Sequence, residues 1–320
     1  MSKDIRITDR MPVSMQVQEV TSVTCHWHDF LEVIWIIRGS AVVCESTMRY
    51  PLCEGDIYVV NYNETHKIIC DSEPAVIGFL FVDYRYFSKY IPNLKEISFA
   101  HYAFSTAPNP DAALVSCRKY MASAYSLLNR EDVKPAEVED MAVPFLKLIV
   151  DTFQYIYYVK DKDGNYIDIL SQNNLTKKQL ERLHRITYYI YMNCGEKLRL
   201  DDLANTELYN RFYISHFIKK AFGLSYQETV SLSRAVISER MLLGTDSSLD
   251  EIASAVGFSS RGQYCSHFRK WHGMSPTQYR RENREDAPGN VDNIFVMQRA
   301  EAEEAIRGSK IGGAVSKIIT

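Results

Sequence analysis

The first 105 residues of the chain contain short apolar runs that are separated by turn-forming residues. The runs are rich in Val, Ile, Tyr and Phe, and Gly, Pro and Asn punctuate them. This pattern is typical of β-strands, and several short strands in succession predict an antiparallel sandwich or barrel. The runs expected to form strands span residues 30–40, 41–46, 55–63, 66–70 and 75–82.

The spacing of apolar residues changes from that of a strand to that of a helix near Asp111. Asp111–Asn129 and Ala136–Lys160 carry apolar side chains every three or four residues, which predicts two helices. Within the second, Pro144 predicts a kink or a helix start. Residues 161–175 are polar and rich in turn formers, so we expect a linker there.

A helical pattern then continues from Thr176 to Arg284. Thr176 is the expected N-cap of its first helix, and Ser225–Leu243 predicts one longer helix in the middle. Beyond Arg284 the sequence EDAPGN breaks the pattern. A short helix is expected around 294–307, in an extension to which the sequence assigns no role.

Length and composition indicate a globular protein with two domains. The chain has 320 residues, with 46% hydrophobic and 24% charged residues, which excludes a disordered or collagen-like chain. It has no apolar stretch long enough for a transmembrane helix and no secretory signal at its N-terminus. Its seven cysteines are scattered without a CxxC pair, which predicts reduced thiols and a cytoplasmic location.

Charge is distributed unevenly along the chain. The formal net charge is −3, so the whole chain does not resemble a nucleic-acid binder. Residues 196–284, however, carry thirteen Lys and Arg against ten Asp and Glu, while the rest has a balance of −6. This sign change favours a polyanionic partner for the C-terminal part.

Two segments of the helical region repeat one arrangement. Residues 198–223 predict a short helix with Ala204, a turn, and a second helix with one apolar stripe; residues 248–273 predict the same, with Ala253 in the short helix and Gly257 in the turn. A short helix, a tight turn and a second helix form the helix-turn-helix motif, whose second helix fits the major groove of DNA.

The solvent sides of the two second helices suit DNA recognition. Arg and Gln read base edges, an aromatic ring contacts the thymine methyl, and Lys and Arg neutralise phosphates. The alternative is a helical bundle with solvated basic faces. The residues expected to contact DNA are Arg211, Phe212, Ser215, His216, Lys219 and Lys220 in the first unit, and Arg261, Gly262, Gln263, Ser266, Arg269 and Lys270 in the second.

The segment Asp250–Arg280 resembles the signature of the AraC/XylS family of transcription regulators. The family pattern I-A-x-x-x-G-F, then F-x-x-x-F-K/R-K, then G-x-S-P-x-x-Y-R matches IASAVGF, YCSHFRK and GMSPTQYR in this chain. The upstream unit fits the more variable first half of the pattern. The chain departs from the pattern at Asn210, Ile218 and Gly262. The resemblance covers residues 176–284 and implies a tandem helix-turn-helix DNA-binding domain.

A second constellation lies in the segment His26–Gly39, which we also expect to be extended. Because residues of equal parity share one face of a strand, His26, His28 and Glu32 are expected to point the same way. A third histidine, His66, follows the next strand and turn. Such a set can bind a divalent transition metal, line the pocket of an effector, or satisfy its own polar groups in the core.

These residues resemble the two motifs of cupin barrels. H-x-H-x(3)-E-x(6)-G is complete from His26 to Gly39, whereas G-x(5)-P-x-G-x-x-H keeps its first Gly and His66 but has Asn61 and Asn63 for Pro and Gly. The resemblance implies an effector-binding barrel whose expected ligand is a small polar molecule such as a carbohydrate. The alternative is a cupin metalloprotein, an enzyme or a metal sensor. The residues expected to contact the effector are His26, His28, Glu32, Trp35, Arg38, Tyr58 and His66.

Together these features predict a multidomain α+β protein with an N-terminal antiparallel, cupin-like β-barrel and a C-terminal all-α domain. We expect a ligand-responsive transcription regulator rather than an enzyme, with no cofactor. Its expected partners are double-stranded DNA, a small-molecule effector, RNA polymerase and a second copy of the chain, with no membrane. The predicted parts are a cupin-like domain (1–105), a helical dimerisation segment (106–160), a linker (161–175), a DNA-binding domain (176–284) and an extension (285–320).

Overall fold

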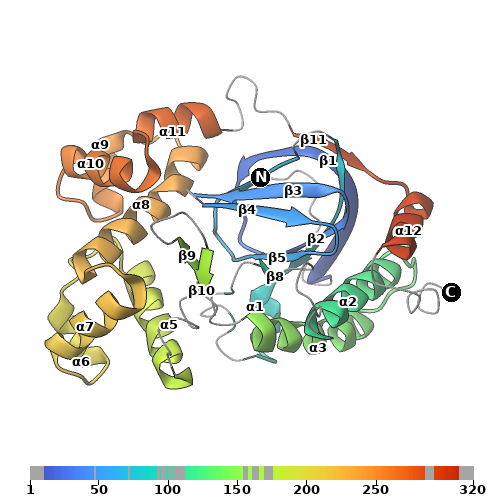
Figure 1. Cartoon of the computed structure of the whole chain (residues 1–320), viewed down its shortest axis with the longest axis horizontal. Helices are drawn as coiled ribbons and strands as arrows, with labels where there is room; N and C mark the ends of the chain where they lie inside the picture. The colour runs from blue at the N-terminus through green and yellow to red at the C-terminus, as the bar shows by residue number, and fades with distance from the viewer. Residues whose placement is uncertain are drawn as a thin grey trace. The chain divides into compact units, whose positions relative to one another are not determined.

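The computed structural model describes residues 11–46, 48–70, 73–91, 94, 99, 102–103, 112–153, 158–160, 166–168, 176–284 and 292–309. The chain divides into two compact units, Met1–Gln154 with Val291–Thr320, and Tyr155–Asn290. The first is an antiparallel β-barrel with helices and the second is mainly helical, which confirms the predicted fold class (Figure 1).

The barrel is built from antiparallel pairs in the order β4-β3-β6-β1-β7-β2-β5-β8, and β11 is added to β1. The strands are β1 (Val13–His26), β2 (Leu31–Arg38), β3 (Ser40–Glu45), β4 (Met48–Cys53), β5 (Ile57–Val60), β6 (His66–Ile69), β7 (Ala75–Val82), β8 (Tyr102–Ala103) and β11 (Asn293–Val296). The five predicted strands are confirmed. The long β1 was not singled out because Ser, Gln and Thr interrupt its apolar positions.

Strand β2 shows how the sheet is buried on both sides. Val33, Trp35 and Ile37 belong to a core cluster shared with helices on the outer face, while Glu32 and Ile34 lie on the opposite face because side chains alternate along a strand. The outer face is covered by α2 (Ala112–Leu128) and α3 (Pro135–Phe153). A short helix, α1 (Tyr84–Phe87), follows β7.

The two predicted helices of the dimerisation segment therefore pack on the barrel of their own chain. Met121 and Phe145 are buried in the same cluster as Trp35, so the inward apolar faces of this segment cover the barrel. Pro144 lies inside α3 and does not start it. The helix predicted up to Lys160 ends at Phe153.

The residues after α3 contain a two-stranded hairpin. β9 (Tyr158–Lys160) pairs antiparallel with β10 (Tyr166–Asp168), so part of the predicted linker 161–175 is a strand. The remainder of that linker lies outside the described residues.

The end of the chain returns to the barrel. β11 pairs with β1, beside which Figure 1 shows it. α12 (Arg299–Gly308) buries Ala302 and Ile306 in the core cluster of β2, α2 and α3. The helix expected around 294–307 is thus corrected, because its first residues form a strand. The extension completes the barrel unit.

The second unit is a helical array. Its helices are α5 (Lys177–Met192), α6 (Leu200–Thr206), α7 (Arg211–Phe222), α8 (Tyr226–Gly244), α9 (Leu249–Ala255), α10 (Arg261–His272) and α11 (Pro276–Asn283). Thr176 caps α5 as predicted, and the hydroxyls of Ser225 and Ser248 cap α8 and α9 with a glutamate three residues later. Among the described residues, no helix is both long enough and apolar enough to cross a bilayer.

Candidate functional site

The two helix-turn-helix units are built on the same turn. After the first helix, the N–H of Tyr209 donates to Ala204 at 2.9 Å, and the N–H of Phe258 donates to Ala253 at 2.8 Å. The residue before each donor is left-handed: Gly257 has φ +85°. Leu208 has φ +57° at the matching place, although it is not glycine.

Each recognition helix starts at a polar cap and is held by its own core. The side chain of Asn210 accepts from the N–H of Tyr213 and caps α7, so Asn210 does there what Ser260 does for α10. The departure from the family pattern at Ile218 is a core position, since Ile218 is fully buried with Ile214. The helix α10 is held by a second core around Tyr264 and Phe268.

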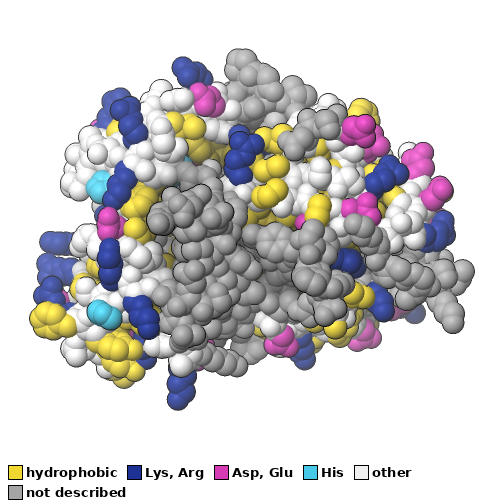
Figure 2. Space-filling model, viewed as in Figure 1, with side chains coloured by type: hydrophobic (Ala, Val, Ile, Leu, Met, Phe, Trp, Pro, Cys, Tyr) yellow, Lys and Arg dark blue, Asp and Glu magenta, His cyan; other side chains and the backbone are white. Residues whose placement is uncertain are grey.

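All twelve residues expected to contact DNA are exposed on α7 and α10. Figure 2 shows Lys and Arg side chains along the outer edge of the helical unit. Arg211 lies 3.5 Å from Asp201 and Arg261 lies 3.7 Å from Asp250, at matching places in the two units. Exposed ion pairs of this kind contribute little, so both guanidinium groups can exchange these carboxylates for phosphate or a base.

Gly262 lies in the first turn of α10, where packing does not require a glycine. A Cβ atom built there meets nothing closer than the Ser260 hydroxyl at 4.0 Å. A glycine in a helix costs about 1 kcal/mol relative to alanine. The space beside Gly262 is therefore consistent with close approach of a ligand to the backbone.

An apolar patch that the sequence does not indicate lies at the turn of the first unit. Leu208 is 89% and Phe212 80% exposed, beside the partly exposed rings of Tyr209 and Tyr213. The patch is visible in Figure 2 as the hydrophobic area over α6 and α7. Only Phe212 was expected at this surface, because nothing in the sequence marks a non-glycine residue as left-handed.

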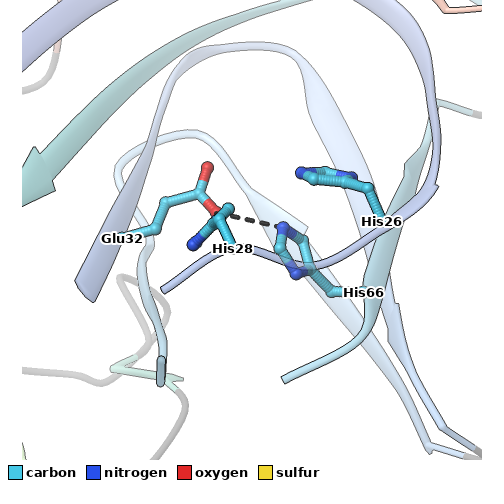
Figure 3. A group of neighbouring side chains, drawn as sticks. All are labelled: His26, His28, Glu32 and His66. Carbon is cyan, nitrogen blue, oxygen red and sulfur yellow. Dashed lines mark hydrogen bonds and ion pairs between the residues drawn. The ribbon is translucent and has the colours of Figure 1, made fainter. Parts of the chain in front are cut away.

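In the barrel, His26, His28, Glu32 and His66 converge on one point (Figure 3). His28 Nε2 lies 2.9 Å and His66 Nε2 lies 3.0 Å from the same oxygen, Glu32 Oε2. The rings of His26 and His66 are 4.2 Å apart. One ligand atom from each of the four side chains lies within 4.8 Å of the others.

His26, His28 and Glu32 do not lie on one strand, contrary to the parity argument, and His66 comes from a separate segment as expected. His26 ends β1, His28 lies in the following loop, Glu32 is in β2 and His66 starts β6. They meet because His26 pairs with His66 across β1 and β6. The turn before β6 contains Asn63 with φ +62°, where the cupin motif has glycine.

The backbone orients all three imidazole rings in the same way. The Nδ1 atoms of His26, His28 and His66 lie 2.9, 3.2 and 3.1 Å from the carbonyl oxygens of Thr24, Phe30 and Glu64, respectively. A carbonyl oxygen only accepts, so each Nδ1 carries a proton and donates it. Each Nε2 then presents a lone pair to the centre of the cluster unless it is protonated as well.

The electrostatics of the cluster follow from burial and the shared carboxylate. Burial alone would raise the pKa of Glu32, but His66 and His28 outweigh it and hold this pKa well below its usual range. Burial alone would lower the pKa of His66, but the Glu32 carboxylate reverses this, and the pKa is raised. Burial and the neighbouring His66 lower the pKa of His26 to about 3. The cluster thus favours an anionic carboxylate with a cation beside it.

The donor set fits a divalent metal ion. Three imidazole nitrogens and one carboxylate are ligands that Zn²⁺ and related ions take, and second bonds from Nδ1 to backbone carbonyls are typical of metal-binding histidines. His26, His28, His66 and Glu32 would hold the ion. Such an ion would place positive charge between the Nε2 lone pairs and the carboxylate.

The other predicted effector residues divide between the two faces of the barrel. Tyr58 lies inside, and its hydroxyl donates to Glu45 at 2.9 Å; burial raises the pKa of Tyr58. Trp35 is fully buried on the outer face under the helices, so it does not belong with the histidines. Arg38 is exposed and lines a separate cavity of about 680 Å³ between the barrel and the C-terminal segment. The placements of Trp35 and Arg38 correct the predicted pocket, and Glu45 was missed.

Comparison with known proteins bears on the helical unit most directly. A family model described as "Helix-turn-helix domain" matches residues 203–282. The regulatory protein PocR of Salmonella typhimurium is 28% identical over 106 residues, which are 33% of this chain and 35% of PocR. This chain carries an AraC-type DNA-binding domain.

Similarity beyond the AraC-type domain is lower. The transcriptional activator RhaS of Pectobacterium atrosepticum is 22% identical over 267 residues, which are 80% of this chain and 87% of RhaS. Among solved structures, ToxT of Vibrio cholerae is 13% identical and has a TM-score of 0.45, over 84% of this chain and 97% of ToxT. The chain spans about a third of the length of PocR.

Proposed function

We propose that the chain is a transcription regulator that binds specific duplex DNA with α7 and α10. The observation that carries this proposal is the pair of equivalent units, each with an exposed second helix that carries Arg or Lys at its start and end. Two such helices can enter successive major grooves about 34 Å apart. The AraC-type domain supports this proposal, because its relatives include proteins named as regulators.

A test of sequence-specific DNA binding needs a duplex that the chain prefers. Selection from a pool of random duplexes supplies it. The full chain should enrich a defined sequence and bind it more tightly than a scrambled duplex of equal length. Arg281→Ala is a matched control, since Arg281 is exposed on α11 outside both recognition helices. Loss of discrimination in Arg261→Ala with normal discrimination in Arg281→Ala would support direct base reading. A pool that yields no enriched sequence would contradict the proposal.

The barrel is the proposed sensor, and it acts without catalysis or a cofactor. A buried polar cluster suits a small polar effector, for which a carbohydrate stays the predicted class. Tyr58 and Glu45, which share the barrel interior, add a hydroxyl and a carboxylate that can bond such a ligand. A thermal-shift screen of sugars and sugar acids tests this class, and a DNA affinity that responds to none of them counts against it.

A divalent metal ion is the second candidate effector, favoured by the orientation of the three histidines. All three Nδ1 atoms face backbone carbonyls, which leaves the Nε2 atoms to converge beside Glu32. Titration with Co²⁺ reports on this directly, because a tetrahedral nitrogen and oxygen site gives visible absorption. Elemental analysis of the purified protein then shows which ion it carries. Neither bound metal nor Co²⁺ absorption would remove this candidate.

A homodimer, contact with RNA polymerase and a cytoplasmic location complete the proposal. A dimer would double the DNA footprint and increase discrimination. Because the apolar faces of α2 and α3 pack on their own barrel, a dimer through residues 106–160 has to use the outward sides of these helices. Light scattering of the full chain at micromolar concentration tests the dimer, and a monomer mass would contradict it.

A further inference from the structure

Residues 292–309, called here the returning segment, include β11, which pairs with β1, the strand that ends at His26. On one edge of β1, β6 and β7 follow one another, since Ser22 pairs with Ile69 and Val20 pairs with Ala75. On the opposite edge the same two residues pair with β11. β11 therefore covers the edge of β1 that the barrel leaves open.

Asp292 extends this contact beyond the end of β11. Its Oδ1 atom accepts from the backbone N–H of Thr24 at 2.8 Å and from the Thr24 hydroxyl at 2.7 Å. The carboxylate takes the place that a carbonyl of a longer strand would fill. Hydrogen bonds to a charged acceptor are about twice as strong as neutral ones, so Asp292 helps to hold Thr24 in place.

Thr24 in turn orients one residue of the His/Glu cluster, which consists of His26, His28, Glu32 and His66. Its carbonyl oxygen accepts from Nδ1 of His26 at 2.9 Å, which fixes the tautomer and the plane of that ring. A continuous set of hydrogen bonds thus runs from the carboxylate of Asp292 through Thr24 to the ring of His26.

Asp292 is also close in sequence to the AraC-type domain. α11 ends at Asn283, and the nine residues from Arg284 to Asp292 carry the chain back to the barrel unit. The DNA-binding unit is therefore covalently joined to the barrel at both of its ends. A second anchor holds the segment further on, because Arg299 donates to the carbonyl of Asn129 at 3.0 Å.

We infer that Asp292 is a positioning residue that couples the His/Glu cluster to the AraC-type domain through Thr24 and His26. The inference rests on the proposed DNA-binding function. Coupling between two sites is reciprocal, so DNA bound to α7 and α10 must alter the ring of His26 if that ring is to influence DNA binding. The coupling can thus be measured without knowing the effector.

The experiment uses the full chain, the selected duplex and nitrogen NMR of the histidine side chains, with His26 assigned by His26→Gln. In the native chain, the duplex should shift the ring nitrogen signals of His26. In Asp292→Ala this shift should vanish while the duplex still binds, and Thr24→Val, which removes only the hydroxyl donor, should reduce it. Arg299→Ala is the matched control: it loosens the other anchor of the same segment and should keep the native shift.

The outcomes separate the inference from the function on which it rests. If the native chain binds no duplex selectively, the proposed function has failed. If it binds the duplex but His26 does not respond, or if Asp292→Ala keeps the full response, the coupling through Asp292 is wrong. If Arg299→Ala abolishes the response as fully as Asp292→Ala, the segment acts only as a structural clasp and the inference is overturned. Thermal unfolding of each variant confirms that it is folded.

Discussion

Leu208 occupies, in the first helix-turn-helix unit, the left-handed position that Gly257 occupies in the second. A non-glycine residue pays about 1–2 kcal/mol in this conformation. Leu208→Gly should therefore stabilise the AraC-type domain by about 1 kcal/mol. The measurement is the free energy of unfolding in urea, and an unchanged or lower value would contradict the assignment of this turn.

The reverse change at Gly257 should be costly. A Cβ atom there would come within 2.4 Å of the Cys194 carbonyl oxygen and 2.7 Å of the Arg234 guanidinium, which itself donates to that carbonyl. Gly257→Ala adds a steric clash to the backbone strain, so we expect a loss of about 2–4 kcal/mol in the same urea experiment.

A buried contact between a histidine and a glutamate holds the second recognition helix. His272 Nε2 lies 2.5 Å from Glu239 Oε1, and the hydroxyl of Tyr279 donates to Glu239 Oε2 at 2.9 Å. Removing one member of a buried pair leaves the other charge or polar group without compensation. Glu239→Ala should thus cost about 3–5 kcal/mol of unfolding free energy. The exposed Glu282→Ala is the control and should change it by less than about 0.5 kcal/mol.

The base-reading and phosphate-binding residues should respond differently to mutation. Arg261→Ala or Gln263→Ala should cost about 1–3 kcal/mol of DNA-binding free energy and relax the preference at one base pair. Lys270→Ala should weaken every duplex alike and lower the slope of affinity against salt by about one. Anisotropy titrations at several salt concentrations separate the two classes. Equal effects on selected and scrambled duplexes for all three variants would contradict base reading by α10.

Glu32 is the residue on which the cluster depends. Both His28 and His66 approach one oxygen of its carboxylate, so Glu32→Gln removes the charge that these two rings contact. We expect the response of DNA affinity to effector to be abolished, while DNA binding itself is kept. Glu54→Gln is the control, because Glu54 lines the separate cavity beside Arg38. The DNA affinity of this variant should respond to effector as that of the native chain does. A Glu32→Gln variant that responds like the native chain would exclude Glu32 from the effector site.

The sequence predicted the AraC-type domain in detail because local signals determine it. Caps such as Thr176, the spacing of Ile214 and Phe217, and a turn glycine act within a few residues, and the structure places them as expected. For the barrel, the sequence predicted the fold class and several strands, but not which side chains point into its interior. Alternation along β2 already places Trp35 on the face opposite to Glu32, so the expected contact of Trp35 with the effector was wrong; which of the two faces the helices cover depends on partners far along the chain.

Long-range contacts also explain what the sequence did not indicate. The end of the chain pairs with β1 more than 260 residues away, and no local pattern in Asn293–Val296 identifies that partner. The apolar surface of α2 and α3 was visible in the sequence, but its partner, the outer face of the barrel, was not. The convergence of four side chains was correctly expected from the cupin-like motifs, although they come from different elements.

The central claim is that α7 and α10 read a specific duplex, and one affinity ratio tests it most directly. The full chain is titrated at physiological salt against the selected duplex and a scrambled duplex of the same length and composition. We expect the selected duplex to bind about a thousandfold more tightly or better, as is typical of specific DNA-binding proteins. Equal affinities for the two duplexes would contradict the account.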